Sequence, residues 1–147
     1  MRVVNQRASY EYRFLEKFET GIALTGPEVK SVKAGKMSLR EGFVRVREGE
    51  AWLHNVYINP YSFADNRSYD PRRRRKLLLH KNELLKLEQQ TREGGLTVVP
   101  VSCYTKGNKI KLEVALARGK KRYEKREAKK RKDLEREVEQ ELRHQGT

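Results

Sequence analysis

The run of five consecutive cations at residues 72–76 has the clearest chemistry in the sequence. It reads Arg-Arg-Arg-Arg-Lys and follows Asp70 and Pro71 directly. Neighbouring like charges repel one another, so the run is unfavourable without an anionic partner. Guanidinium groups match phosphate oxygens, and their planes stack on bases. The run therefore predicts contacts with a nucleic-acid backbone. The predicted ligands are Arg72, Arg74, Arg75 and Lys76.

A second cluster supports this interpretation. Residues 118–126 read Arg-Gly-Lys-Lys-Arg-Tyr-Glu-Lys-Arg, in which a tyrosine interrupts the cations. Such a segment suits a path along RNA backbone with the ring stacked on a base. Four aromatic side chains just before the first run could stack in the same way. They are Tyr57, Tyr61, Phe63 and Tyr69. The competing interpretations are a solvated basic loop and a solubilising tail.

Lys30 and Lys33 would share one face of a short helix, opposite Val29 and Val32. We include both lysines among the RNA-binding candidates. Taken alone, this pattern is also that of an ordinary amphipathic turn.

Catalytic patterns are weak. His54, His80 and His144 lack metal-ligand spacing, and Cys103 lies in an expected strand. Asp65 and Asp70 could in principle hold Mg²⁺ in a nuclease, but the cations after Asp70 argue against that. We expect no catalytic residue, no metal and no cofactor.

The chain has 147 residues and a net charge of +14, which favours one domain and a polyanionic partner. A single cysteine excludes an internal disulfide and fits a reducing compartment. No stretch approaches the roughly 20 apolar residues of a membrane helix. We expect a soluble cytoplasmic protein that makes no membrane contact.

Alternating residues predict short strands over 10–14 and 18–24, with Gly21 marking a bulge or a close backbone approach. A short helix should begin at 26–28, where proline and a carboxylate suit a helix start, and stop at Gly35.

Further along, residues 43–58 predict a hairpin that turns at 48–49, and residues 59–71 predict a loop. A buried strand is expected at 77–79. An amphipathic helix is expected over 82–93.

The cleanest alternation predicts a second hairpin from 96–104 and 109–116. Short antiparallel strands with two or three short helices favour a mainly β fold, a small closed barrel of the oligonucleotide-binding (OB) type over residues 1–117. A split βαβ sandwich is the alternative.

Residues 118–147 form a tail of different composition. Its first half, 118–132, carries ten basic and two acidic side chains, whereas 133–147 carries two basic and five acidic ones. The apolar series Leu134, Val138 and Leu142 is narrow. Many charges with little apolar area predict a tail that is disordered alone and becomes helical on binding.

Four motifs, in order, resemble the SmpB family of bacterial tmRNA-binding proteins. They are NQRASYEY at 5–12, GPEVKSVKAG at 26–35, DPRRRRKLLLH at 70–80 and LARGKKRYEKR at 116–126. The resemblance covers nearly the whole chain, and the last two motifs are the most specific. Gln6 and Tyr10 depart from the usual basic residue and histidine, and Val32 and Lys33 replace leucine and arginine.

The resemblance implies an OB-type barrel that holds the tRNA-like domain of tmRNA. It implies that Glu19, Leu78 and His80 lie at the RNA-binding surface. It further implies that the tail enters the decoding centre and empty mRNA channel of a stalled ribosome. The tail residues concerned are Gly119, Lys120, Lys121, Tyr123, Glu124, Lys125 and Arg126.

We therefore expect a non-enzymatic monomer that acts in ribosome rescue. Elongation factor Tu and alanyl-tRNA synthetase would be partners through the tmRNA complex. The rivals are another structured-RNA binder such as a ribosomal protein, the Asp65/Asp70 nuclease, and a membrane binder. The last is disfavoured because no helix combines a basic face with a broad apolar one.

Overall fold

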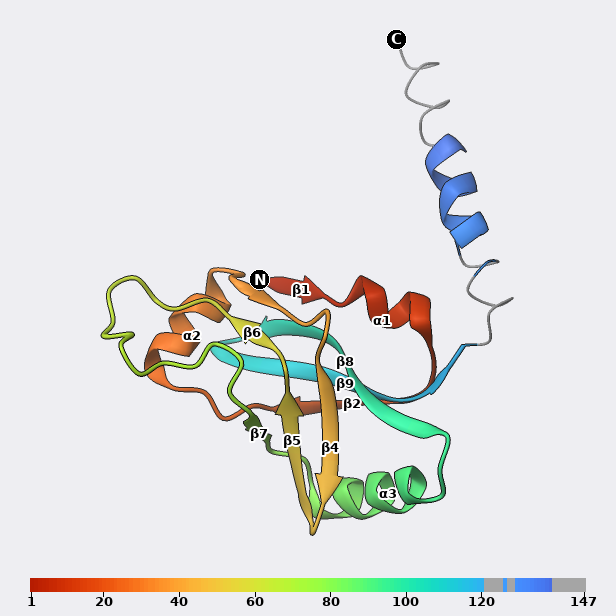
Figure 1. Cartoon of the computed structure of the whole chain (residues 1–147), viewed down its shortest axis with the longest axis horizontal. Helices are drawn as coiled ribbons and strands as arrows, with labels where there is room; N and C mark the ends of the chain where they lie inside the picture. The colour runs from red at the N-terminus through yellow and green to blue at the C-terminus, as the bar shows by residue number, and fades with distance from the viewer. Residues whose placement is uncertain (121–125, 127–128, 139–147) are drawn as a thin grey trace.

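The structure of the chain is a computed structural model, which describes residues 1–120, 126 and 129–138 (Figure 1). Within this part, an antiparallel sheet of seven strands has the order β2-β9-β8-β4-β5-β7, and β1 also pairs with β8. The strands are β1 (Arg2–Val4), β2 (Tyr12–Gly21), β4 (Phe43–Arg47), β5 (Glu50–His54), β7 (Arg75–Leu77), β8 (Leu96–Lys106) and β9 (Lys109–Gly119). A separate pair joins β3 (Met37–Ser38) to β6 (Tyr57–Ile58).

The predicted β8–β9 hairpin is confirmed, and it is longer than the sequence indicated. Leu112, Val114 and Leu116 are buried, so the alternation identified the inward face. Gly107 adopts a φ of 61° in the turn, a conformation that glycine reaches without strain. β9 continues past Leu116 to Gly119, which pairs with Tyr12. The sheet therefore extends beyond the expected domain end at residue 117.

Helix α2 (Gly26–Lys33) begins where the sequence predicted. Thr25 Oγ1 accepts a hydrogen bond from the Glu28 backbone N–H, and the Glu28 carboxylate accepts one from the Thr25 N–H. This reciprocal cap satisfies two backbone donors at the helix start. The helix ends at Lys33, and Gly35 follows with a φ of 73°.

Helix α3 (Lys81–Arg92) and the β4–β5 hairpin also match the prediction. Leu87 of α3 is completely buried, and α3 lies against β4 and β8 (Figure 1). Glu48 and Gly49 form the hairpin turn with φ values of 53° and 73°. The expected strand at 77–79 instead lies at β7, two residues earlier.

The N-terminal segment differs from the prediction. Residues 6–11 form helix α1 (Gln6–Glu11), and β2 is one long strand rather than two short ones. Asn5 explains the helix, because its Oδ1 caps the Ala8 N–H at 3.1 Å. The β-bulge lies between Phe14 and Glu16 instead of at Gly21.

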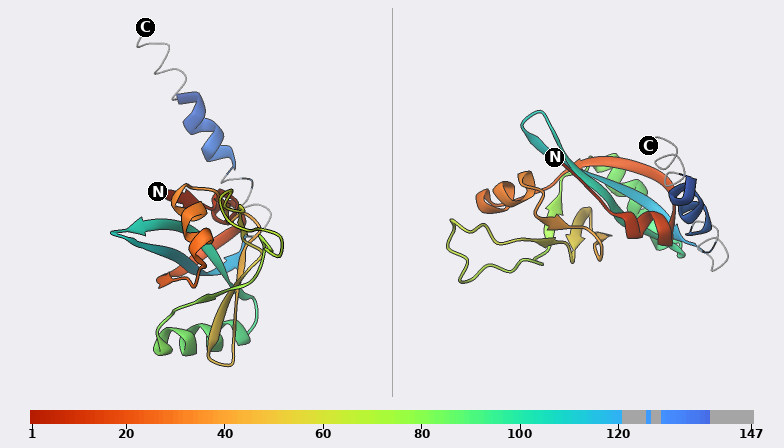
Figure 2. Two further views of the ribbon diagram at one scale, coloured as in Figure 1. Left: turned by 90° about the vertical axis from the view of Figure 1, so that its left-hand side faces the viewer. Right: turned by 90° about the horizontal axis from the view of Figure 1, so that it is seen from above.

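The prediction of a closed barrel is wrong. β2 and β7 end the strand order, and only an isolated bridge between Ile22 and Leu77 joins the chain beyond β2 to β7. Around this bridge, the Leu78 N–H donates to the Gly21 carbonyl at 3.0 Å. The sheet curves back on itself without closing, as Figure 2 shows. The coarser prediction of a mainly β, antiparallel fold with three short helices before the tail is confirmed.

In the tail, residues 129–138 are helical, and their side chains are exposed. This segment leads away from the sheet in Figure 1. No helix in the described part of the chain is long and apolar enough to cross a membrane.

Candidate nucleic-acid interface

The cationic run at residues 72–76 divides into an inner and an outer set. Arg75 is fully buried, and its guanidinium donates to Glu28 Oε2, at 2.8 Å from Nε, and to the carbonyls of Val56 and Pro71. Arg73 reaches the other oxygen of Glu28. In this arrangement Arg75 cannot reach a phosphate, so the structure contradicts its predicted role as a phosphate ligand.

Glu28 is the centre of this buried network and is itself 1% exposed. Burial opposes its ionisation, but hydrogen bonds from Arg73, the Thr25 N–H and Arg75 outweigh that effect and lower its pKa to about 2. Tyr69 Oη donates to the same carboxylate at 3.1 Å. The network ties α2 to the segment before β7, which fixes the direction of the exposed cations.

The outer set is Arg72, Arg74 and Lys76. Arg72 lies 5.5 Å from the Tyr57 ring centroid and donates to Asn55 Oδ1 at 3.0 Å. Arg74 lies 4.2 Å over the Trp52 ring. Each of these cations remains exposed to solvent, and their predicted phosphate contacts stay predictions.

Glu19 lies on the outward face of β2, with two hydrogen-bond donors beside it. Tyr104 Oη donates to Glu19 Oε2, and Lys106 Nζ lies 3.2 Å from Oε1. These hydrogen bonds lower the pKa of Glu19, while burial and the Glu19 carboxylate raise that of Tyr104 to about 12. The Arg2 guanidinium lies 5.3 Å from the Tyr104 ring centroid.

Leu78 lies near the same end of β2 and is 59% exposed. A Cβ on Gly21 would lie 3.3 Å from Leu78 Cδ1, so the predicted close backbone approach at Gly21 is confirmed. The two residues line a hollow whose other walls include Lys109 and Lys111. An exposed leucine with cations beside it is suited to the sugar and backbone of an RNA strand.

His80 and the α2 lysines occupy other parts of the surface. His80 is the N-cap residue of α3, and its backbone N–H donates to Glu83 Oε1 at 3.0 Å. Its side chain is left to solvent. Lys30 and Lys33 are exposed on α2, as expected for a solvated helix face.

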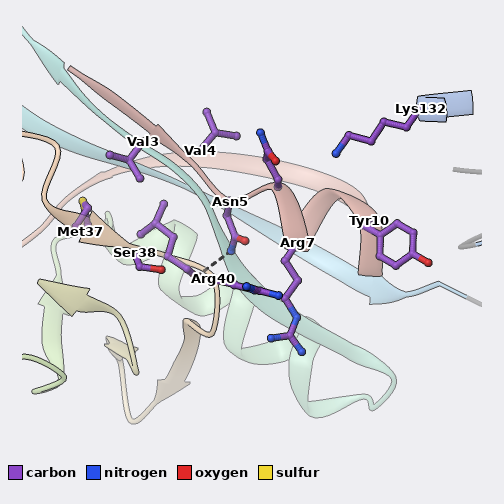
Figure 3. Close-up of a pocket in the computed structure, with 11 residues that line it drawn as sticks. Val3, Val4, Asn5, Arg7, Tyr10, Met37, Ser38, Arg40 and Lys132 are labelled. Atoms are coloured by element: carbon purple, nitrogen blue, oxygen red, sulfur yellow. Dashed lines mark hydrogen bonds between the residues drawn. The ribbon is translucent and has the colours of Figure 1, made fainter. Parts of the chain in front are cut away.

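A further hollow, missed by the sequence analysis, lies beside α1 (Figure 3). Arg7, Tyr10 and Arg40 line it. Asn5, which also lines this hollow, links the segments around it: its Nδ2 donates to the Leu39 carbonyl at 3.0 Å and to the Pro100 carbonyl at 2.9 Å. Apart from Tyr12, which begins β2, the residues of the first motif thus lie at the start of α1 and along it.

Among the predicted tail residues, Gly119, Lys120 and Arg126 are described. Lys120 is attached to α1, because its backbone N–H donates to the Glu11 carbonyl at 2.8 Å and its Nζ donates to the Ser9 carbonyl at 3.0 Å. The other predicted residues, Lys121, Tyr123, Glu124 and Lys125, lie outside the described residues.

The side chains considered for catalysis or metal binding, Asp65, Asp70 and Cys103, have surroundings that explain them as structural residues. Asp65 pairs with Arg67 at 2.8 Å, and Asp70 Oδ1 accepts the Arg72 N–H at 3.0 Å. Burial raises the pKa of the Cys103 thiol to about 12, as suits a core residue. Within the ranges the structure describes, no three His, Cys, Asp or Glu side chains are grouped to hold a metal ion.

The sequence analysis also missed the outward face of the β4–β5 hairpin. Arg45 lies opposite Trp52, and Phe43 lies opposite His54. In β4 the buried Val44 and Val46 alternate with Arg45 and Arg47, so the two-residue period of a strand places both arginines on the outer side.

Comparison with known proteins gives one consistent answer. The family described as "SmpB protein" matches residues 2–144. An SsrA-binding protein of Sulfurihydrogenibium sp. (strain YO3AOP1) is 54% identical over 92% of this chain and 89% of its own length. An SsrA-binding protein of Carboxydothermus hydrogenoformans is 49% identical over 95% of this chain and 93% of its own length.

A solved structure agrees with these relatives. A chain from "tmRNA-SmpB: a journey to the center of the bacterial ribosome" is 44% identical and superposes with a TM-score of 0.69. The match covers 86% of this chain and 93% of the other. With both the family match and close relatives over nearly its whole length, the chain belongs to the SmpB family.

Proposed function

We propose that this chain binds the tRNA-like domain of tmRNA and delivers it to stalled ribosomes for trans-translation. The observation that carries the proposal is the family match over residues 2–144, together with relatives named for binding SsrA. The solved chain of similar fold belongs to a tmRNA–ribosome structure. The net charge of +14 supports a large polyanionic partner.

Glu19, Leu78 and His80 are the proposed contacts with the tRNA-like domain. The proposed roles of Glu19 and Leu78 are supported by their position. Glu19 lies near the end of β2, and Leu78 packs against Gly21 at that end. The lysines at 109 and 111 supply positive charge beside Leu78. Folded RNA is recognised largely through shape, backbone and 2′-hydroxyl groups, and this mixed polar and apolar surface suits such contacts.

For the tail, we propose a position in the decoding centre and the empty mRNA channel. Its support is the +8 charge of residues 118–132 and the helical, exposed segment 129–138. Ordering a helix costs roughly 1–2 kcal/mol per residue in backbone entropy, which contacts with ribosomal RNA would offset. Tyr123 is the proposed stacking residue.

The remaining parts of the proposal concern partners and setting. We expect a monomeric, non-enzymatic factor in the cytoplasm, where ribosomes work. Elongation factor Tu and alanyl-tRNA synthetase would join it through tmRNA. The OB topology also remains part of this proposal, since a curved antiparallel sheet with one face left for oligonucleotides is consistent with it.

The direct test is recovery of RNA bound to the full chain in a bacterial extract, followed by sequencing. We expect tmRNA to be enriched far above its share of total RNA. Enrichment of ribosomal RNA fragments in its place would support the rival structured-RNA binder and contradict the proposal.

A further inference from the structure

The outward face of β4, β5 and β7 combines cations and aromatic rings outside the proposed tmRNA contacts at Glu19, Leu78 and His80. Strand pairing places Arg45 opposite Trp52, and Trp52 opposite Lys76. Figure 1 shows these three strands side by side. The face is hollowed, and it is lined by Arg45, Arg47, Glu48, Glu50, Trp52, His54 and Arg74.

Two stacked layers are already formed on this face. The Arg74 guanidinium lies 4.2 Å from the Trp52 ring centroid. Phe43 and His54 stack at a centroid distance of 5.1 Å with 7° between their planes. Arg45 lies 5.8 Å from the Phe43 centroid. Planar groups held in this way present flat surfaces on which a nucleic-acid base can stack.

The electrostatics favour an anion over another partner. Arg45, Arg47 and Arg74 line the hollow together; burial lowers the pKa of the His54 imidazole beside them, and the charges of Arg45 and Arg74 lower it further. The charge of Glu50 is partly compensated by Lys76, whose Nζ lies 3.5 Å from its carboxylate, and Trp52 Nε1 donates a hydrogen bond to it at 3.1 Å. Arg45 and Arg47 are exposed, and no ion pair of either is found among the described residues.

We propose that this face binds an unpaired segment of RNA, with a base stacked on the Arg74–Trp52 layer and phosphates held by Arg45 and Arg47. Unpaired bases can turn outward to meet such a layer, whereas those of a duplex are stacked on one another. The proposal rests on the proposed function and adds an RNA contact centred on Arg45, Arg47 and Trp52. Arg74 and Lys76, already predicted as phosphate ligands, belong to the same face. A molecule with both surfaces could hold a folded RNA and a single strand at once.

The protein carries its own reporter for this contact, since Trp52 is the only tryptophan in the chain. The full chain would be titrated with a short single-stranded RNA oligonucleotide while tryptophan fluorescence is recorded. We expect saturable quenching by the single strand and little quenching by a duplex of the same sequence. Equal quenching by the duplex would overturn the proposed stacking.

Variants separate stacking from charge. Arg74→Lys keeps the charge but removes the planar layer, so quenching should fall while binding at low salt persists. Arg45→Gln with Arg47→Gln should flatten log K against log[salt] by roughly 1.4, since each single-strand phosphate that is no longer neutralised accounts for about 0.7. Arg67→Gln with Lys86→Gln removes equal charge from other exposed sites and serves as the control. If the control pair flattened the salt dependence equally, the binding would depend only on net charge, and the proposed site would be wrong.

Affinity for the tRNA-like domain of tmRNA, measured on the same proteins, distinguishes this inference from the proposed function. We expect Arg45→Gln with Arg47→Gln to retain that affinity, and Leu78→Ala to lose it while keeping the quenching. Absence of quenching with intact binding of the tRNA-like domain would overturn the second contact alone. Quenching without tRNA-like domain binding would overturn the proposed function alone.

Discussion

At the scale of single residues, Glu28 is the side chain on which the local structure depends most. Its carboxylate neutralises Arg75 inside the protein, and both groups are almost completely buried. Removing one partner of such a pair leaves the other charged and unpaired, which typically costs about 3–5 kcal/mol. We expect Glu28→Gln to lose about 3 kcal/mol of unfolding free energy at neutral pH, measured by urea denaturation. Glu16→Gln, which breaks the exposed pair with Lys86, should change it by less than about 1 kcal/mol.

The same carboxylate predicts a pH dependence. Its pKa is lowered from 4.5 to about 2 in the folded protein, so folding favours the charged form. The stabilisation is complete above the unfolded pKa and is lost as the pH falls from 4.5 towards 2. The difference in unfolding free energy between the unaltered protein and Glu28→Gln should therefore shrink over this range. A constant difference would show that Glu28 does not titrate as the network requires.

Two adjacent leucines separate folding from binding. Leu77 is 2% exposed, whereas Leu78 is 59% exposed. Leu77→Ala should therefore lose about 2–5 kcal/mol of stability, and Leu78→Ala much less. We expect Leu78→Ala to weaken binding of the tRNA-like domain while its melting temperature stays close to that of the unaltered protein. Filter binding and thermal melts on both variants test this, and unchanged affinity in folded Leu78→Ala would remove Leu78 from the interface.

At the scale of secondary-structure elements, successive side chains of the cationic run at residues 72–76 point alternately inward and outward along the segment that leads into β7. Arg75 points inward to Glu28, while Arg74 and Lys76 point outward. We expect Arg74→Ala to change stability by about 1 kcal/mol at most, as for an exposed cation–π contact, and to flatten the salt dependence of RNA binding by somewhat under one unit. Arg75→Ala should instead unfold more readily, by about 3–5 kcal/mol. Equal loss of stability in the two variants would contradict this division.

The elements that the sequence predicted correctly are those with long, local patterns. The β8–β9 hairpin shows alternation over many residues, and α2 carries its own capping residues. Helix α1 has six residues, too few for a helical period to emerge, and the aromatic alternation at 10–14 pointed to a strand. What holds α1 in place is Asn5, through carbonyls of Leu39 and Pro100 that are remote in the sequence.

The same distinction holds for the candidate site. The charge of residues 72–76 was visible in the sequence, and so was the resemblance that singled out Glu19 and Leu78. The burial of Arg75 was not, because its partner Glu28 lies 47 residues earlier. The failure of the sheet to close likewise depends on how β2 and β7 meet, which local patterns do not determine. Sequence motifs predicted the residues of the candidate surface, and pairing between distant elements decided which of these side chains are exposed.

At the scale of the whole molecule, the end of the last strand is fixed against α1 and the start of β2. α1 follows the first strand, and Lys120, just after the last strand, donates its backbone N–H to the Glu11 carbonyl of α1. Gly119 pairs with Tyr12 in the same region. These contacts set the point at which the tail leaves the sheet, beyond the end expected from the alternation.

This junction determines how the tail should be tested. A protein ending at Lys120 retains every pairing of β9 with β2, so we expect it to melt near the temperature of the full chain. Ending at Ala117 removes the pairs that Arg118 and Gly119 make with Arg13 and Tyr12, so that version should be less stable. The comparison separates damage to the sheet from loss of the tail.

The protein ending at Lys120 then tests the division of labour between the sheet and the tail. Its Glu19 and Leu78 surface is intact, so it should keep most of its affinity for the tRNA-like domain of tmRNA. It lacks Tyr123 and the cations at 121–132, so it should fail to support peptidyl transfer to tmRNA on stalled ribosomes. Filter binding and a stalled-ribosome transfer assay on the same preparation measure the two activities. Full transfer without the tail would show that the tail is dispensable, whereas loss of RNA binding in a protein shown to be folded would place part of the RNA contact within the tail.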